Sequence, residues 1–435
     1  MLFRSTGPGT HSAPLGLSPD PGGIVLQYAN EGFGDLATNP SNAPAYSTLT
    51  AGSLIAVPAY ADAVILRGTA FGQPESGIRA DTELWPGLDA FVVVDKNNQN
   101  RFPPRDGTDG ADALTAEEVR TIIGEAIKVA HRTRAQVRRP LGSPAGETIV
   151  ITDTNGVVLG IGRTRDALVD AIDVTTQKAR TAVFFSGDYA ADDIDSVPPA
   201  NYFADTVSNG AVNITTLAQS SPSKYITAAR AFLGQPTAFA DGKIAYSDRA
   251  IGLLSQPFYP SGVPGAPNGP FSLPFDLWSP FQTGLELDLA YNQILLSIAY
   301  ILNQDGLAIN LDGATLAPAP TVANPTPLPD VLPGSCTGIP RIANGITLFP
   351  GGFPIYRNGK LVGGIGASGD GSDQSDLVAF LGLSNGAAVL NTGLQQAAGS
   401  IRSDTLSPVN SRLLYVQCPQ APFTDTNDAN VCEGK

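Results

Sequence analysis

Two Asn-Gly dipeptides constrain the fold of this chain more than any other feature. Asn155-Gly156 and Asn358-Gly359 each stand between two short runs of apolar and β-branched residues. In that setting Asn-Gly is the strongest short-range signal for a β-hairpin, and it favours a type I′ turn. The sequence therefore predicts two antiparallel hairpins far apart in the chain. Their expected strands are 148–152 with 157–161, and 353–357 with 360–367.

A helix is expected before the first hairpin. Thr115 and Glu118 have the spacing of a capping box, which satisfies two free N–H groups at a helix start. Apolar residues then recur at helical spacing and form one stripe, opposite an ordinary charged face. Pro140 is the expected stop, since proline cannot continue a helix. The stripe consists of Val119, Ile122, Ile123, Ala126, Ile127 and Ala130.

Weaker patterns mark the remaining elements. A second helix is expected at about Asp173–Phe185, and Ser372-Asp373 is expected to cap a helix over Leu377–Leu381. The proline-rich stretch 317–333 has the composition of a polyproline II linker. Further strands are expected at 63–66, 90–94 and 412–417, and further helices at 223–233, 285–302 and 386–398.

The order of these elements predicts an α+β fold. Helix, hairpin and helix are followed by a long loop-rich insertion and then by a second hairpin and helix. Four antiparallel strands with helices on one or both faces would satisfy this order. The expected divisions are an N-terminal extension (1–112), a first half-domain (113–187), the insertion (188–340), a second half-domain (341–400) and a C-terminal tail (401–435).

Composition excludes several classes of protein. Of the 435 residues, 42% are hydrophobic and only 15% are charged, which is too apolar and too weakly charged for a disordered chain. The formal net charge is −14, whereas binding to nucleic acid phosphates or to anionic lipid needs a basic face. We therefore expect neither kind of partner.

The sequence shows neither a membrane span nor a signal peptide. The most apolar stretch, Ile294–Leu302, is far shorter than the ~20 residues of a membrane span. No apolar core follows the first residues, so no signal peptide is expected in this chain. The single Met and the abundant Thr, Ser, Asn and Gly nevertheless favour a secreted or periplasmic protein.

The three cysteines exclude two kinds of redox chemistry. None forms a CxxC or CxxCH motif, as a thioredoxin-like site or a covalent c-type haem would require. Cys418 and Cys432 bracket a short polar tail, and a disulfide between them would imply an oxidising compartment. Cys336 is an alternative partner, and three free thiols are the other alternative.

Three segments resemble ligand-binding motifs without the features that binding requires. Gly364, Gly366 and Gly369 form a literal G-x-G-x-x-G, but the preceding strand belongs to a hairpin and acidic residues follow, so we reject dinucleotide binding. The glycines instead predict a close approach to a neighbouring element. Calcium-loop spacing starts at Asp95 and at Asp425 and is incomplete in both, which leaves solvated Asx-rich loops as the alternative.

His131 is the candidate metal ligand. The chain has two histidines, too few for a typical zinc site, and no G-x-S-x-G elbow that would indicate a Ser-His-Asp enzyme. His131 stands in the last turn of the capped helix, just outside its apolar stripe. It is either a cation favoured by the helix macrodipole or an axial ligand to a haem iron.

A local basic cluster accompanies the second helix. Arg163 and Arg165 precede this helix, and Lys178 and Arg180 lie on it. Guanidinium and ammonium groups could bind carboxylates such as haem propionates or a small organic acid. They could equally pair with nearby aspartates, as surface charges commonly do.

Two stretches of the chain resemble the GlcG/HbpS-like haem-binding family. Residues 115–187 carry the Asp153-x-x-Gly156 hairpin and the Lys178-Ala179-x-Thr181-Ala182 helix. Residues 351–383 carry Gly-Gly-x-Pro, then Gly-Gly-Ile-Gly-x-Ser-Gly, and then an acidic helix start. The resemblance implies a profilin-like antiparallel sheet with flanking helices, frequent oligomers, and haem or a related tetrapyrrole as ligand.

Three functions follow from these observations. The first is haem binding or sensing without catalysis, with a site composed of His131, Arg163, Arg165, Lys178, Gly364, Gly366 and Ser368. The second is a structural subunit of an extracytoplasmic homo-oligomer that keeps the fold without the ligand. The third is an enzyme on a small carbonyl or acid, which lacks a nucleophile–base pair and ranks last, with Asp153 and Asp373 as the carboxylates to test.

Overall fold

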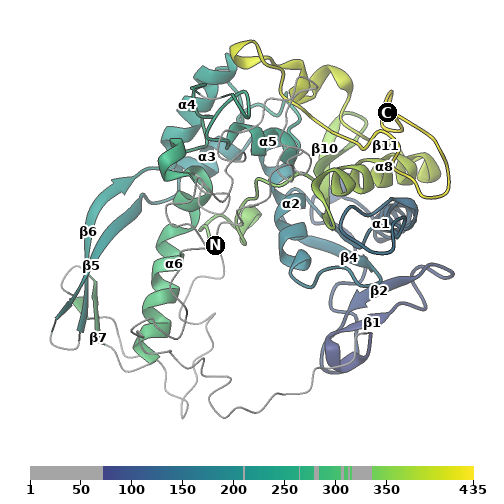
Figure 1. Cartoon of the computed structure of the whole chain (residues 1–435), viewed down its shortest axis with the longest axis horizontal. Coiled ribbons are helices and arrows are strands. Elements are labelled where there is room, and N and C mark those ends of the chain that lie inside the picture. The colour runs from purple at the N-terminus through teal and green to yellow at the C-terminus, as the bar shows by residue number, and fades with distance from the viewer. Residues whose placement is uncertain are drawn as a thin grey trace, which may run out of the picture.

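A seven-stranded antiparallel sheet forms the centre of the molecule (Figure 1). The computed structural model describes residues 72–208, 211–263, 265–278, 284–304, 308–311, 314–315 and 336–435. The strand order is β1-β2-β4-β3-β10-β9-β11. The strands are β1 (Ile78–Ala80), β2 (Ala90–Val93), β3 (Glu147–Thr152), β4 (Val158–Thr164), β9 (Gly352–Arg357), β10 (Lys360–Gly369) and β11 (Leu394–Gln395).

The predicted α+β class with an antiparallel sheet and flanking helices is confirmed, but the sheet is larger than expected. Both predicted hairpins form, β3–β4 and β9–β10, and β10 pairs with β3 to join them. The expectation of four strands was wrong. At one edge β2, which confirms the strand predicted at 90–94, and β1 join the sheet, and β11 extends the other edge. The predicted strand at 63–66 lies outside the described residues.

The two Asn-Gly turns differ in conformation. Asn358 and Gly359 both have positive φ, at 49° and 84°, as a type I′ turn requires. At the first turn Gly156 has a φ of 76°, whereas Asn155 is not among the residues with positive φ. Asp153 organises that turn instead, because its Oδ1 accepts hydrogen bonds from the N–H groups of Asn155 and Val157. The expected type I′ turn was therefore wrong for the first hairpin.

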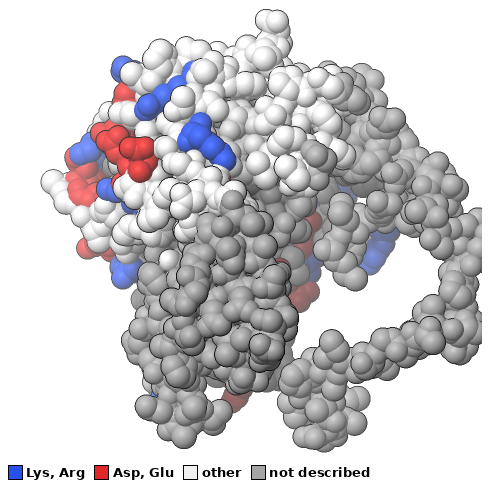
Figure 2. All heavy atoms as spheres, turned by 90° about the vertical axis from the view of Figure 1, so that its left-hand side faces the viewer, with Lys and Arg blue, Asp and Glu red and all other residues white. Residues whose placement is uncertain are grey.

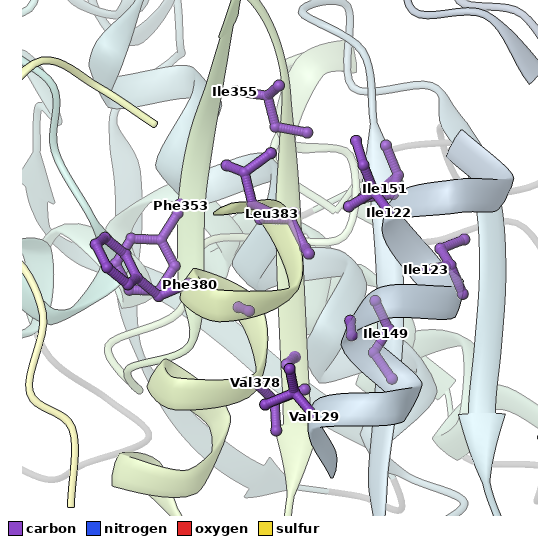
Figure 3. Packing of buried hydrophobic residues seen from close by; sticks show 14 of the residues in the cluster. Ile122, Ile123, Val129, Ile149, Ile151, Phe353, Ile355, Val378, Phe380 and Leu383 are labelled. Carbon is purple, nitrogen blue, oxygen red and sulfur yellow. The ribbon is translucent and has the colours of Figure 1, made fainter. Parts of the chain in front are cut away.

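Helices α1 (Ala116–Arg132) and α8 (Ser372–Leu390) cover one face of the sheet. The predicted capping box is present, with Thr115 and Glu118 bonded reciprocally. Figure 3 shows the core between these helices and strands β3 and β9. The labelled side chains are Ile122, Ile123, Val129, Ile149, Ile151, Phe353, Ile355, Val378, Phe380 and Leu383.

Both ends predicted for these helices need correction. α1 ends at Arg132 rather than near Pro140, because Thr133 is extended and bridges to Phe423 of the tail. Gly371, not Ser372, is the N-cap of α8. The two short helices expected at 377–381 and 386–398 are one helix up to Leu390.

Two glycines explain why α8 continues where breaks were expected. A Cβ at Gly382 would lie 2.5 Å from the Cβ of Ala126, and one at Gly386 would lie 2.9 Å from Cγ1 of Ile122. Real Cβ atoms do not approach other atoms so closely, so these positions let α1 and α8 touch. The glycines therefore serve helix packing rather than helix termination.

Helix α2 (Ala171–Ser186) covers the opposite face of the sheet. The close approach predicted for the glycines of β10 is confirmed. A Cβ at Gly366 would lie 2.4 Å from the carbonyl oxygen of Thr175, and one at Gly364 would lie 2.4 Å from Cγ2 of Val183. The helix backbone thus rests directly on the strand.

The insertion is more ordered than predicted and contains a second core. The helices expected at 223–233 and 285–302 are present, and the four-stranded sheet was not expected. Phe184 and Phe185 at the end of α2 pack into this second core with Tyr246, Phe239 and Phe271. The elements are α3 (Ala190–Asp195), β5 (Ala200–Ser208), β6 (Ala211–Ser220), α4 (Ser223–Leu233), α5 (Asp248–Leu254), α6 (Gly284–Gln304), β7 (Ala308–Leu311) and β8 (Ala314–Thr315).

The described part of the insertion surface carries few charges. Figure 2 shows it as mainly uncharged, with acidic and basic side chains intermingled near one edge. Within the described residues, no helix is long and apolar enough to cross a membrane. The proline-rich segment 317–333 lies outside the described residues.

The C-terminal tail runs over the ends of α1 and α8 without forming a strand. The strand expected at 412–417 was wrong, because this segment bonds to side chains and loops rather than to a neighbouring strand. A disulfide joins Cys418 to Cys432, and both cysteines pack against the main core. Cys336 is free and exposed. Short 3₁₀ turns occur at 74–76, 110–112, 275–277, 340–342, 399–401, 403–405 and 408–410.

Candidate functional site

The predicted site residues do not converge on one place. His131 and Arg165 do meet, because both contact Asp89, where β2 begins and β4 ends. Nε2 of His131 lies 3.2 Å from the carbonyl oxygen of Asp89. Arg165 donates two hydrogen bonds of 2.7 Å to the Asp89 carboxylate, and its guanidinium lies over the ring of Phe91. Both side chains are therefore occupied by partners within the chain.

Lys178 lies in a buried cluster of charges. Only 3% of it is exposed, and its Nζ donates a hydrogen bond of 2.9 Å to the carbonyl oxygen of Ala367. The fully buried carboxyl groups of Glu147, Asp248 and Asp376 surround it. Burial lowers the pKa of Lys178 and raises the pKa of Glu147 to about 8. Lys178 thus belongs to the interior and does not line the open pocket described below.

The same cluster connects the insertion to the core. Arg249 of α5 donates hydrogen bonds to Asp373 and Asp376 at the start of α8. Its neighbour Asp248 points the other way, toward Lys178, and no side chain or backbone group among the described residues donates a hydrogen bond to its carboxyl oxygens. Burial raises the pKa of Asp248, the neighbouring Asp376 carboxylate raises it further, and the charge of Lys178 acts in the opposite direction.

Gly364, Gly366 and Ser368 lie on the face of β10 that α2 covers. The two glycines are in direct contact with the helix, and Ser368 pairs across the sheet with Thr148 and is only 9% exposed. Their positions account for the glycine-rich sequence through packing. A ligand cannot reach them without displacing α2.

The incomplete calcium loops and the candidate catalytic carboxylates have roles in turns and ion pairs. Oδ1 of Asp95 accepts the N–H groups of Asn97 and Gln99. Asp425 pairs with Arg132 at 2.7 Å. Asp153 accepts from the backbone and hydroxyl of Thr108 as well as from its own hairpin. Among the described residues, no group of three acidic, His or Cys side chains is placed to hold a metal ion.

An open pocket of about 330 Å³ lies between α2 and β4. We call it the α2–β4 pocket. Its lining is apolar on the strand side, and its polar side chains are Asp170, Asp173, Thr176, Arg180 and Asn344. α2 contributes residues 172, 173, 176 and 180, whose spacings of three and four place them on one helix face. The lining residues are Phe102, Val158, Ile161, Val169, Asp170, Ile172, Asp173, Thr176, Arg180 and Asn344.

Arg180 is held rigidly at the polar edge of the pocket. Its Nε donates to the carbonyl oxygen of Gly156 at 2.8 Å, and its Nη1 donates to Oδ1 of Asn344. Asn344 in turn donates to Asp173 at 3.0 Å. Burial lowers the pKa of Arg180, but a guanidinium remains charged at any physiological pH.

Most of the residues that line the α2–β4 pocket could not be predicted from the sequence. Arg180 belongs to the basic cluster that the sequence shows. The apolar side chains come from separate segments that no pattern in the sequence connects. The available signal was the four-residue spacing of Ile172, Thr176 and Arg180 on a helix whose other face is also apolar. Arg163 is near the pocket without lining it, beneath the loop that follows β4.

Comparisons with known proteins give a match to one family model and similarity to solved structures. Residues 327–384 match the model of the family described as haem degrading protein HbpS-like. The chain is also similar to a solved structure titled PduOC:heme complex, at 13% identity and a TM-score of 0.24, covering 66% of this chain and 99% of that one. Klebsiella pneumoniae protein ORFY, of family DUF336, is similar at 13% identity and a TM-score of 0.26, with 68% and 99% covered.

No curated protein matches the chain significantly. The family match covers the β9–β10 hairpin and the first part of α8, which is the second of the two stretches on which the resemblance rests. That match makes this part of the chain similar to the family described as haem degrading protein HbpS-like.

Proposed function

We propose that this protein binds haem or a related tetrapyrrole in the α2–β4 pocket, without acting on it as an enzyme. The observation that carries the proposal is the pocket itself, which joins apolar walls to a fixed guanidinium. Ligand sites typically combine a mainly apolar surface with a few placed polar groups. The description of the matched family as haem-degrading supports haem as the ligand class.

The residues that line the pocket are suited to contact with the ring of a tetrapyrrole but not to coordination of its metal. Phe102, Ile161 and Ile172 offer apolar contact, and Arg180 can pair with a carboxylate at the edge. No lining residue among those described is His, Cys, Met or Tyr, the usual ligands of haem iron. His131 contacts Asp89 and does not line the pocket. A bound haem would supply a redox-active iron, and the chain would supply the contacts to its ring and carboxylates.

A titration with two probes tests this proposal. Haemin is followed by its Soret band, and metal-free protoporphyrin IX by its fluorescence. We expect saturable binding of both, because the pocket recognises ring and carboxylates. Val169→Glu should weaken both about tenfold or more, because it places a carboxylate at the pocket mouth, where Val169 is 65% exposed.

The matched control is Val137→Glu, which makes the same change at a side chain that is 70% exposed and outside the pocket. It should bind like the wild type. His131→Ala should also bind haemin normally, and a loss confined to haemin in that variant would restore His131 as the axial ligand. No saturable binding of either probe by the folded protein would overturn the proposal. Loss of the Soret band with a reductant present would replace binding with degradation.

The alternative of an assembly subunit rests on a different observation. Val137 and Leu141 are apolar side chains exposed by 70% and 81% on the loop between α1 and β3. Exposed apolar side chains that gather on one surface are typical of contact surfaces. Size-exclusion chromatography with light scattering of the ligand-free chain measures this directly, and a stable oligomer without ligand would favour assembly. We also propose a secreted or periplasmic location, which the disulfide supports.

A further inference from the structure

Arg163 is a fully buried cation whose hydrogen-bonding capacity is not filled. It is 0% exposed. Its Nε donates to Oγ1 of Thr148 at 3.2 Å, and its Nη2 donates to the carbonyl oxygens of Ala167 and Leu168. Its Nη1 is buried and has no hydrogen-bond acceptor among the described residues.

No carboxylate offsets this charge within the described part of the chain. The partly buried Arg249 and Arg180 each have an acidic partner or neighbour, Asp376 and Asp173 respectively. Burial alone lowers the pKa of Arg163, with no acidic group acting against it. A buried guanidinium without an anion is costly, so such residues are normally paired.

Arg163 does not line the α2–β4 pocket, but residues on both sides of it in the chain do. Ile161, two residues earlier on the same face of β4, lines the pocket. The loop that covers Arg163 runs directly into Val169 and Asp170, which form another wall. The side chains of Leu168 and Val169 are 50% and 65% exposed, so this loop buries little apolar surface. Segments of this kind open at low cost in free energy.

We propose that Arg163 is a second anion-binding residue beside the pocket, in addition to Arg180, and that a carboxylate of the ligand reaches it beneath the loop of residues 167–169. The inference rests on the proposed function and identifies the ligand class more narrowly, as an apolar ring bearing a carboxylate side arm. The carboxylate occupies Nη1 and replaces the carbonyl oxygens at Nη2. Charge-assisted bonds of this kind are stronger than those to neutral carbonyls, which favours the exchange.

The test compares haemin with haemin dimethyl ester, which keeps the ring and iron and lacks free carboxylates. We expect the wild type to bind haemin about tenfold or more tightly than the ester. Arg163→Gln should remove most of the preference for haemin over the ester and leave ester binding unchanged. Arg163→Lys, which keeps the charge, should recover part of the preference.

Arg79→Gln is the matched control, because Arg79 also donates to a backbone carbonyl, that of Ala80, and does not line the pocket. It should keep the full preference for haemin. Equal binding of haemin and ester by the wild type would overturn this inference while the proposed function stands. This comparison needs only the wild type, so it remains decisive even if Arg163→Gln fails to fold. A preference that survives in Arg163→Gln and disappears in Arg180→Gln would also overturn it. Binding of neither compound would overturn the proposed function, and this inference with it.

Discussion

Arg357 of β9 donates two hydrogen bonds to Glu118 of α1, with Nη1–Oε1 at 2.8 Å and Nη2–Oε2 at 2.7 Å. The pair connects the two halves of the core domain across the insertion. The same carboxylate closes the capping box at Thr115 and accepts a hydrogen bond from Thr392. One side chain therefore begins a helix and holds two distant segments together.

Glu118→Gln should destabilise the protein at neutral pH by about 2 to 4 kcal/mol, because it leaves Arg357 without its anion. The pKa of Glu118 is lowered to about 2 by its hydrogen bonds with Arg357, Thr115 and Thr392. Its contribution is complete above the ordinary glutamate pKa and is lost as pH falls toward 2. Urea unfolding at pH 7 and pH 3.5 should show a smaller difference from the wild type at the lower pH. Glu117→Gln, whose partner Arg120 is exposed, is the control and should change stability little; a loss equal to that of Glu118→Gln would contradict this account.

Glu147→Gln should change the pH dependence in the opposite direction. The raised pKa of Glu147, about 8, means that the folded protein keeps a proton that the unfolded chain releases above pH 4.5. Stability therefore falls as pH rises from about 4.5 to 8, and the variant should remove that slope. Thermal unfolding at pH 5 and pH 9 should show that the variant is more stable than the wild type only at pH 9. The difference in the free energy of unfolding should be on the order of a few kcal/mol. The exposed Glu433 provides a control substitution, and a gain of the same size at both pH values would refute the assignment.

Gly366→Ala should destabilise the protein by about 1 to 3 kcal/mol, because the new Cβ would overlap the backbone of α2 at Thr175 and Ala179. Backbone atoms of a packed helix cannot move aside as a flexible side chain can. Gly399→Ala is the control, since a Cβ there meets nothing within 4 Å. Denaturant unfolding of both variants makes the comparison. Equal stabilities would mean that α2 does not rest on β10 as described.

Cys418→Ser should lower stability by about 2 to 4 kcal/mol under oxidising conditions, because it opens a loop with a sequence separation of 14. The loss should be largest in the tail, where Phe423 bridges to Thr133 at the end of α1. Limited proteolysis should therefore cut the tail of the variant before the core. Cys336→Ser should behave like the wild type, because Cys336 forms no disulfide. Identical proteolysis of the two variants would argue against a clamped tail.

Local interactions explain which parts of the structure were predictable. The capping box of Thr115 and Glu118 and the turn at Asn358-Gly359 depend on a few neighbouring residues, so their sequence signals are sufficient. The same Asn-Gly signal stands at residues 209 and 210 of the sequence, between β5 and β6. The break expected within α8 was wrong, because Gly382 and Gly386 pack against α1, which lies far away in the sequence.

The candidate site depended on contacts that no single segment encodes. The sequence showed a resemblance to a family, an α+β class and a set of basic residues, because each of these depends on composition or on short-range pattern. It did not show that Lys178 would be buried by α5 and α8, that Arg165 would pair with Asp89, or that Arg163 would lie beneath a loop without an anion. Those outcomes follow from strand order and from the packing of α2, which bring residues 102, 161, 172 and 344 to one pocket. Burial and partner choice are set by distant segments meeting in space, and only the folded chain contains that information.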